Sequence, residues 1–264
     1  MSSQKIPFPS RVKGCLRLTC FFLLCIPSFR IQPPFLMFLD QKTVCRIPRF
    51  WHWCVCKIMG IKVVVKGTPA SHGPTFFVSN HLSYLDIPVI GQTLTTYFIA
   101  KKEVETWPLF GWLSKLQKTL FIKRNTDGLE KAASDITRHI EQNHSLTIFP
   151  EGTSSDGQRV LPFKSSLFAV FFNKGKPETN VEIQPFTIRL AEIDGKAPQS
   201  EEDYNIYAWH GEMELPPHLW TFACSKGAVI ELVFHPSFGI SPEDTRKTLC
   251  LKSYEMVKSG LEKS

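Results

Sequence analysis

The chain has 264 residues, of which 43% are hydrophobic and 21% are charged. This composition excludes a disordered tail, a collagen and a polytopic membrane protein, and the length allows one large or two small domains. The formal net charge is +7. Residues 1–67 carry a net charge of +10 and residues 68–264 a net charge of −3, so the excess belongs to the N-terminus and does not indicate nucleic-acid binding.

The basic N-terminal segment is also the most apolar part of the chain. Its apolar runs, Leu18–Ile26 and Phe35–Leu39, are separated by three prolines, and Pro27 is expected to end the first run. Each run is much shorter than the roughly 20 residues that a membrane-spanning helix needs. We predict that residues 1–58 form a short membrane-associated helical hairpin whose basic side chains meet anionic lipid head groups. A secretory signal peptide is the alternative, but no small-x-small cleavage site follows.

The chain contains eight cysteines, and six of them lie in the N-terminal segment. They form no CxxC pair and show no zinc-ligand spacing. A metal site and a disulfide framework are therefore not expected, and the cysteines indicate the reducing side of a membrane. We expect them to pack as small hydrophobic residues.

From residue 61 onward, strand patterns alternate with helix patterns. Predicted strands are Ile61–Lys66, Thr75–Ser79, Tyr97–Ala100, Thr119–Lys123, Ser145–Phe149, Val181–Leu190 and Ala228–Phe234. Predicted helices begin at Ser83 and cover Trp107–Lys118, Leu129–Ile140, Phe163–Asn173 and Pro242–Leu261. This alternation predicts an α/β fold in which residues 59–264 form a single domain.

A polar segment, Asn80–Asp86, follows the strand at Thr75–Ser79. Residues five apart on one helix point about 140° away from each other, so His81 and Asp86 cannot meet inside a helix. At a strand-to-helix corner, however, the carboxylate can reach one imidazole nitrogen and leave the other as a general base. A structural interpretation stays open, because Ser83 and Asp86 have the spacing of a capping box and a lone histidine is usually a core residue.

A second polar segment follows the strand at Ser145–Phe149. Glu151, Gly152 and Thr153 are suited to hydrogen-bonding a polar substrate at the C-terminal edge of an open α/β sheet. The same residues could instead form an ordinary turn and helix cap. The spacing from Gly152 to Gly157 is one residue too long for a G-x-S-x-G nucleophile elbow, which disfavours a serine hydrolase.

Two further positions carry weaker signals. Arg124 lies just past the strand at Thr119–Lys123, where a guanidinium can bind phosphate or carboxylate, although such an arginine is more often solvated. Pro185 lies within the strand pattern Val181–Leu190 and cannot donate to a central ladder, which predicts a strand edge or a bulge.

Taken together and in this order, these segments resemble the glycerolipid acyltransferase family, whose members include 1-acylglycerol-3-phosphate acyltransferases. Its four sequence blocks are matched by His81 and Asp86 (His-x4-Asp), Phe121 and Arg124 (F-x-x-R), Phe149–Gly152 (F-P-E-G) and the Pro-containing Ile183–Phe186. The resemblance covers roughly residues 60–235. It departs at Lys118, where many members have glycine, and at Gln184, where an aliphatic residue is usual.

The resemblance implies a mixed-sheet acyltransferase domain with helices on the sheet faces, and roles for particular residues. His81 is expected to deprotonate the hydroxyl of a lysolipid, which attacks the thioester of an acyl carrier protein or coenzyme A, while Asp86 fixes the imidazole tautomer. Arg124 is expected to hold the anionic group of the acceptor. The other residues expected around the substrate are Asn80, Ser83, Glu151, Gly152 and Thr153. No cofactor is implied, and the implied location is the cytoplasmic face of the inner membrane, in contact with membrane lipids.

Two lysolipids are the candidate acceptors. Lysophosphatidate comes first because it is the commoner acceptor in the family. A lyso-ornithine lipid follows closely, because Trp107–Trp112 and Tyr207–Glu212 look like the bacterial branch that includes lyso-ornithine lipid O-acyltransferases. A thioester or lipid hydrolase and a non-catalytic membrane adaptor are the alternatives from other classes.

Overall fold

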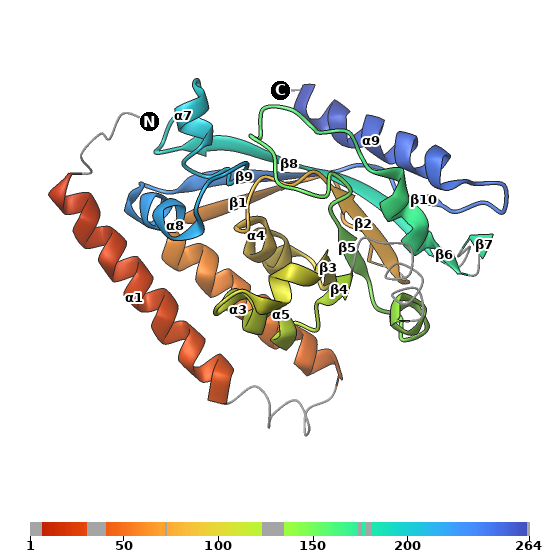
Figure 1. Ribbon diagram of the computed structural model, residues 1–264, viewed down its shortest axis with the longest axis horizontal. Coiled ribbons are helices and arrows are strands. Elements are labelled where there is room, and N and C mark those ends of the chain that lie inside the picture. The colour runs from red at the N-terminus through yellow and green to blue at the C-terminus, as the bar shows by residue number, and fades with distance from the viewer. Residues whose placement is uncertain are drawn as a thin grey trace.

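The computed structural model describes residues 7–30, 41–71, 73–122, 135–173, 176–177 and 181–262. They form one mixed β-sheet with helices on both sides (Figure 1), which confirms the predicted α/β class. In spatial order its strands are β1 (Ile61–Lys66), β9 (Ala228–Phe234), β8 (Glu182–Ile193), β2 (Thr75–Ser79), β5 (Leu146–Ile148), β3 (Tyr97–Lys101) and β4 (Leu120–Ile122), with β10 (Phe238–Gly239) also beside β8. A separate hairpin joins β6 (Phe172–Asn173) and β7 (Lys176–Pro177).

The direction of the strands decides which loops meet. Strand β2 lies between β5 and β8 and is parallel to both, whereas β9 is antiparallel to β8 and β1 is parallel to β9. The segments that follow β2 and β5 therefore leave the sheet at the same edge and lie next to each other. These two segments contain the polar residues of Asn80–Asp86, after β2, and Glu151, Gly152 and Thr153, after β5.

The sheet separates two hydrophobic cores. On β2, Phe77 belongs to one core, and its neighbours Phe76 and Val78 belong to the other, as expected for alternating side chains. The Phe77 side is covered by α1 (Phe8–Arg30), α3 (Gln41–Met59), α4 (Asp86–Thr93), α5 (Phe110–Leu116) and α8 (Leu215–Cys224). The other side is covered by α9 (Arg246–Glu262), the 3₁₀-helix η2 (Ser165–Phe171) and a helical turn at residues 135–141 (Figure 1). The described residues also form two short helices, η1 (Lys102–Thr106) and α7 (Glu201–Tyr204).

The N-terminal segment forms two helices that pack against the rest of the molecule. Helix α1 continues through Pro27 to Arg30, so the prediction that Pro27 ends it is wrong. Proline removes one backbone bond, which a helix can lose near its C-terminal end. The second apolar run, Phe35–Leu39, lies outside the described residues. Within the described part of the chain, every helix is too short or too polar to cross a bilayer.

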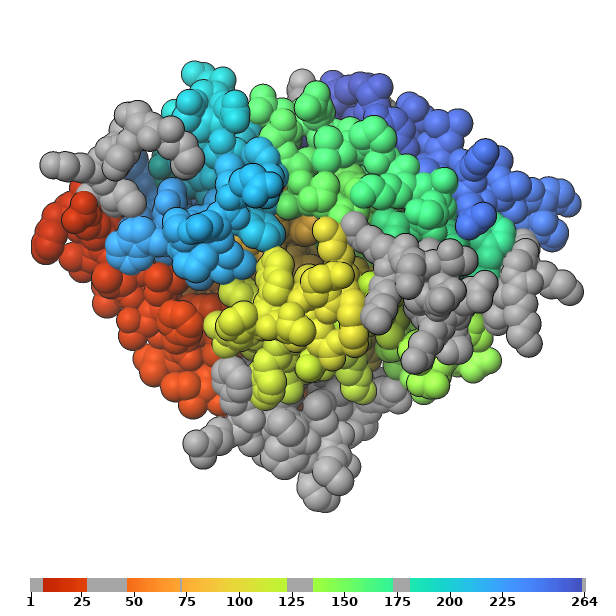
Figure 2. Space-filling view, in the orientation of Figure 1, coloured from red at the N-terminus to blue at the C-terminus, as the bar shows by residue number. Residues whose placement is uncertain are grey.

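Helix α1 is fastened to α8. The guanidinium of Arg17 donates to the carbonyl oxygens of Ala223 (3.2 Å), Ser225 (2.9 Å) and Lys226 (3.3 Å), which are among the carbonyls left unpaired at a helix end. Figure 2 shows α1 along the rim of the molecule, next to α8. Because Phe21 belongs to the same core as the sheet, the N-terminal segment is more than an external attachment. The domain boundary between residues 58 and 59 stays a prediction.

Two helix assignments differ from the predictions. The predicted helix Phe163–Asn173 is instead the 3₁₀-helix η2 followed by β6, in a segment rich in aromatic and serine residues that favour helices weakly. Helix α8 was not predicted. It carries Pro216 and Pro217 in its first turn, where prolines are tolerated.

Strand β8 lies in the interior of the sheet, so the prediction of an edge at Pro185 is wrong. The carbonyl of Pro185 accepts from the backbone N–H of His235 (3.0 Å), just beyond the end of β9. A residue's N and O point to the same side of a strand, so the missing N–H of Pro185 faces the break between β9 and β10. The side chain of Gln184 bridges this region, bonding to the backbone of Thr68, Ala70 and His235.

Candidate active site

His81 and Asp86 meet at the corner between β2 and α4. The Nδ1 atom of His81 lies 2.8 Å from Oδ2 of Asp86, which confirms the predicted meeting of the two side chains. Asp86 is the first residue of α4 and its side chain is fully buried, whereas the side chain of His81 is 21% exposed. One partner is thus fixed in the interior and the other can reach solvent or a substrate.

Both oxygens of the Asp86 carboxylate accept hydrogen bonds. Its Oδ2 atom also accepts the backbone N–H groups of Leu82 (2.7 Å) and Ser83 (3.0 Å). Its Oδ1 atom accepts the hydroxyl of Tyr207 (2.9 Å). The bond to the Ser83 N–H is the contact that a capping box would make, but the N-cap of α4 is Leu85 and has no side-chain cap, so Asp86 braces the loop before the helix and orients the histidine with the same group.

The contact with Asp86 selects the histidine tautomer. The carboxylate accepts a hydrogen bond from Nδ1–H, which leaves the lone pair of Nε2 available as a base. The imidazole also stacks on the ring of Phe149, with 4.1 Å between ring centroids and 16° between planes. Phe149 comes from the loop after β5, so this second loop fixes the plane of the imidazole.

Glu151 holds the backbone of His81. Its Oε2 accepts the N–H of His81 (3.1 Å) and its Oε1 accepts the N–H of Leu161 (2.9 Å). On the other side of the same residue, the backbone N–H of Ser155 donates to the carbonyl of His81 (2.7 Å). Burial raises the pKa of Glu151 to about 8, against the opposing effect of the two N–H donors. These contacts position the histidine, and a contact of Glu151 with substrate stays a prediction.

The remaining predicted site residues lie at the same corner in different settings. Gly152 has a φ of 71° and donates its N–H to the carbonyl of Phe149 (3.0 Å), while Thr153 is exposed. The side chain of Asn80 is buried and pairs with both the N–H (2.8 Å) and the carbonyl (2.9 Å) of Ile188, as an extra rung between β2 and β8. For Gly152, Thr153 and Asn80, a contact with substrate stays a prediction.

Ser83 is also buried, and its hydroxyl lies 3.4 Å from the N–H of Leu85. Its predicted contact with substrate is untested as well. Arg124 lies outside the described residues, although Phe121 of the same block lies in β4. Lys118 has a φ of 55°, in the left-handed region that glycine adopts most easily. A lysine therefore occupies here a backbone conformation that suits the glycine of the related sequences.

The sequence analysis assigned no role to Tyr207 or to the aromatic residues around it. The backbone N–H of Trp209 donates to the carbonyl of Leu82 (2.9 Å), and the hydroxyl of Ser154 donates to the carbonyl of Trp209. Three loops are thereby joined at the active corner. No spacing rule links residues so distant in the chain, so only the structure reveals this contribution.

An apolar cavity of about 110 Å³ opens beside the loop that carries His81. Tyr84 and Leu85 line it from that loop, Trp107 and Phe110 line it from the segment around η1 and α5, and Phe21 lines it from α1. This lining suits hydrocarbon. The N-terminal helices therefore help to form an apolar cavity lined by residues that closely follow His81 in the chain.

The geometry indicates general-base chemistry without a serine nucleophile. The hydroxyl of Ser155 donates to the carbonyl of His81 (3.1 Å), and that of Ser154 is also bound to a carbonyl. The described residues contain no cluster of three or more histidine, cysteine, aspartate or glutamate side chains able to hold a metal ion. The arrangement fits a histidine that activates a hydroxyl group brought by a substrate.

Comparisons with known proteins identify the family of this chain. Residues 60–189 match the family model described as Acyltransferase. The lyso-ornithine lipid O-acyltransferase of Rhodobacter capsulatus is 35% identical over 219 residues, which cover 83% of this chain and 74% of that protein. This chain belongs to the acyltransferase family.

Two further relatives place this acyltransferase more finely. A 1-acyl-sn-glycerol-3-phosphate acyltransferase of Neisseria gonorrhoeae is 27% identical over 171 residues, covering 64% of this chain and 62% of that one. The crystal structure of the 1-acyl-sn-glycerophosphate acyltransferase PlsC from Thermotoga maritima matches with a TM-score of 0.67 and 21% identity, and covers 96% of each chain. The fold of this acyltransferase is therefore that of PlsC.

Proposed function

We propose that this acyltransferase moves a fatty acyl group from an acyl thioester to the free hydroxyl of a lysolipid. The observation that carries the proposal is the 2.8 Å contact between His81 and the buried Asp86. It leaves Nε2 free, in a site where the hydroxyls of Ser154 and Ser155 already donate to carbonyl groups. The nucleophile therefore comes from the acceptor.

The reaction follows from these positions. Nε2 of His81 takes the hydroxyl proton, the acceptor oxygen attacks the thioester carbonyl, and Asp86 stabilises the imidazolium that forms. When the carbon–sulfur bond breaks, the thiolate leaves and takes up the proton from the imidazolium. Rigid placement of His81, by Glu151 and Ser155 on its backbone and by the ring of Phe149, reduces the orientational entropy lost at the transition state.

We place a lyso-ornithine lipid first among the acceptors and 1-acylglycerol-3-phosphate second. The relative of 35% identity that covers 83% of this chain is a lyso-ornithine lipid O-acyltransferase, which supports the first acceptor over the one favoured by the sequence analysis. The Neisseria relative supports the second. Both acceptors carry an anionic group that the guanidinium of Arg124 can bind, and the apolar cavity beside Tyr84 suits part of an acyl chain.

A direct assay tests the activity and the acceptor together. Purified protein is incubated with palmitoyl-acyl carrier protein or palmitoyl-coenzyme A and with each lysolipid separately, and products are identified by mass spectrometry. We expect the lyso-ornithine lipid to gain the chain faster than 1-acylglycerol-3-phosphate. Release of free fatty acid at the same rate without acceptor would instead indicate a hydrolase, and the reverse order of rates would assign the second acceptor.

Arg124 is tested against its neighbour. Lys123 has a similar charge and adjoins Arg124, and the alternation of the sequence predicts that the two side chains lie on opposite faces. We expect Arg124→Ala to raise KM for the lysolipid about tenfold and Lys123→Ala to change it little, since a bidentate contact is lost in the first variant only. Equal effects of the two substitutions would assign the anion to general positive charge.

We also propose that the outer face of α1 and α3 lies in the cytoplasmic surface of a membrane. Apolar side chains are exposed along it, namely Phe8, Val12, Leu16, Phe22, Leu23, Ile26, Phe50 and Trp53. Patches of this kind on a basic helix bind lipid surfaces. The apolar face and the cavity of the same helices would let a lipid chain pass from the bilayer to the active site.

A point substitution tests membrane binding better than a deletion, because deleting residues 1–58 would also remove Phe21 and Val55 from the core. Leu23 on α1 is 58% exposed and Leu251 on α9 is 61% exposed, so they form a matched pair. We expect Leu23→Glu to reduce co-sedimentation with phosphatidylglycerol vesicles severalfold and Leu251→Glu to leave it unchanged. Equal binding by both variants would contradict the membrane face.

A further inference from the structure

We infer that Tyr207 is a positioning residue for the acyl transfer, holding the buried carboxylate of Asp86 in its orientation toward His81. The inference rests on the proposed function for its kinetic consequences, but its structural part can be measured independently. Tyr207 comes from the segment between α7 and α8, 121 residues away from Asp86 in the sequence.

The two oxygens of Asp86 have different partners. Oδ2 accepts from Nδ1 of His81 and from the backbone N–H groups of Leu82 and Ser83. Oδ1 accepts the hydroxyl of Tyr207 (2.9 Å), its only donor among the described residues. Three donors on one oxygen and one on the other fix the rotation of the carboxylate about its side-chain bond. The tyrosine hydroxyl thus helps to hold the plane of the carboxylate in the orientation in which one oxygen meets Nδ1 of His81.

Burial makes this contact necessary. The side chain of Asp86 is fully buried, and an ionised carboxylate is stable in such a place only when its oxygens are hydrogen-bonded. Removing the donor to Oδ1 would leave a buried charged oxygen without a partner, so the carboxylate would be held less firmly in the position that meets Nδ1 of His81. A carboxylate displaced from Nδ1 would stabilise the imidazolium less.

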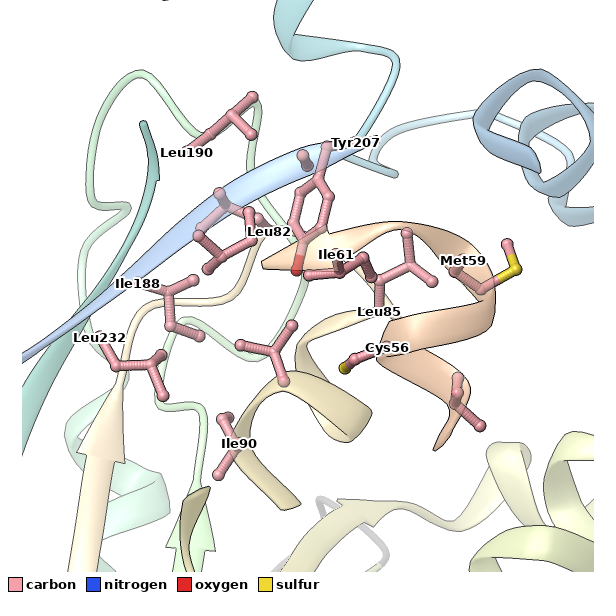
Figure 3. Packing of buried hydrophobic residues seen from close by; sticks show 14 of the residues in the cluster. Cys56, Met59, Ile61, Leu82, Leu85, Ile90, Ile188, Leu190, Tyr207 and Leu232 are labelled. Atoms are coloured by element: carbon pink, nitrogen blue, oxygen red, sulfur yellow. The ribbon is translucent and has the colours of Figure 1, made fainter. Parts of the chain in front are cut away.

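Tyr207 is itself firmly placed. It is fully buried, in the same hydrophobic cluster as Leu82, Leu85 and Cys56 (Figure 3), and its ring packs edge-on against Phe222 with 5.8 Å between centroids. Burial, followed by the charge of Asp86, raises the pKa of Tyr207 well above its usual value. The hydroxyl therefore stays protonated and remains a donor throughout the physiological pH range.

The other titratable groups around Asp86 come from three elements. His81 lies in the same loop, Glu151 lies in the loop after β5, and Cys56 lies on α3, where it interacts with Tyr207. Burial raises the pKa of the Cys56 thiol to about 12, so it stays neutral. Tyr84, also near Tyr207, has a pKa raised by burial and stays neutral too. Within this setting, the hydroxyl of Tyr207 is the group that supplies a proton donor to Oδ1.

The test compares Tyr207→Phe with Tyr84→Phe. Tyr84 is also a largely buried tyrosine whose hydroxyl makes one hydrogen bond, to Nδ1 of His218 (3.0 Å), so both variants lose one buried hydroxyl contact. We expect Tyr207→Phe to lower kcat roughly tenfold with little change in the acceptor KM, and to shift the acid limb of the pH–rate profile. In Tyr84→Phe we expect the position of that limb to be unchanged.

A measurement without turnover separates this inference from the proposed function. The Nδ1–H proton of His81 is observed by NMR at a pH above the acid limb, and it is assigned by its absence in His81→Ala. We expect its resonance to shift in Tyr207→Phe and to stay in place in Tyr84→Phe, provided that both variants give native-like spectra. An unchanged resonance and an unmoved acid limb in Tyr207→Phe would overturn the positioning role. A shifted resonance in a protein without acyl transfer would leave that role intact and contradict only the proposed function.

Discussion

His81 and His218 each belong to a hydrogen-bonded network that includes a tyrosine, but their surroundings give the two imidazoles different chemistry. His81 pairs with the carboxylate of Asp86 and remains 21% exposed. His218 on α8 is buried between the hydroxyl of Tyr84 (3.0 Å, at Nδ1) and the carbonyl of Ala208 (3.1 Å, at Nε2). Only the first has a ring nitrogen left for a substrate.

The difference lies in the partner and in the access. The neutral carbonyl next to His218 cannot compensate an imidazolium as a carboxylate does, and burial lowers the pKa of His218 to about 4. His218 therefore stays neutral and joins α8 to the loop that carries Tyr84. A catalytic histidine in this fold thus requires a charged partner behind it and open space in front.

The largest effect on activity is expected from removing the imidazole of His81. We expect His81→Ala to lower kcat about a thousandfold, because the general base and its contribution to the transition state are both removed. His218→Gln, which keeps polar atoms in place of the second imidazole, should retain kcat within about threefold, because no reacting atom is touched. Steady-state acyl transfer measures both, with circular dichroism as the check on folding. Full activity of folded His81→Ala would remove His81 from the mechanism.

Substitution of the charged partner should give the next largest effect. We expect Asp86→Asn to lower kcat about a hundredfold or more with a smaller change in the acceptor KM, since the amide can neither stabilise the imidazolium nor impose the same tautomer. Asp156→Asn is the matched control, because Asp156 also accepts a backbone N–H, from Gln158 (3.0 Å), but outside this pair. A loss expressed mainly in KM would mean that Asp86 contributes to binding.

The part of the site that could be predicted is the part encoded by short-range rules. The pattern Thr75–Ser79 predicts a strand, and the polar residues after it require a corner at which His81 and Asp86 can meet. Parallel pairing of β2 with β5 then places Glu151 beside His81. The strand and the corner follow from periodicity and the direction of the chain, whereas the pairing of β2 with β5 is seen only in the structure.

The rest depends on tertiary contacts that no local pattern contains. Tyr207 reaches Asp86 across 121 residues of sequence, along a path set by β8, α7 and α8. Pro185 resembles an edge residue in the sequence, yet it lies in an interior strand, because the neighbouring ladder is interrupted just opposite it. Pro27 does not end α1, whose inner face is stabilised by packing on α3 and α8. Packing overrides local preference in the last two cases.

Glu151 should make the free energy of unfolding depend on pH. Its pKa is raised by burial from 4.5 to about 8, so between these values the folded protein keeps a proton that the unfolded chain releases. The stabilisation from this group is therefore complete below pH 4.5 and is lost as the pH rises toward 8. We expect Glu151→Gln, which cannot titrate, to flatten the fall in the free energy of unfolding between pH 5 and pH 8 in urea titrations. Parallel slopes for the wild-type protein and the variant would show that Glu151 is ionised in the folded state.

His218 should make the opposite and smaller contribution, which sharpens the contrast with His81. Its pKa is lowered by burial from 6.5 to about 4, so in this range the unfolded chain binds a proton that the folded protein does not. Stability therefore falls as the pH drops below 6.5, by at most about 3 kcal/mol for this group. Because His218→Gln has no such proton to bind, we expect its free energy of unfolding to fall less between pH 6.5 and pH 4 than that of the wild-type protein. Parallel pH dependences of the free energy of unfolding for the wild-type protein and His218→Gln would mean that His218 is charged in the folded protein. Burial would then not be what distinguishes His218 from His81.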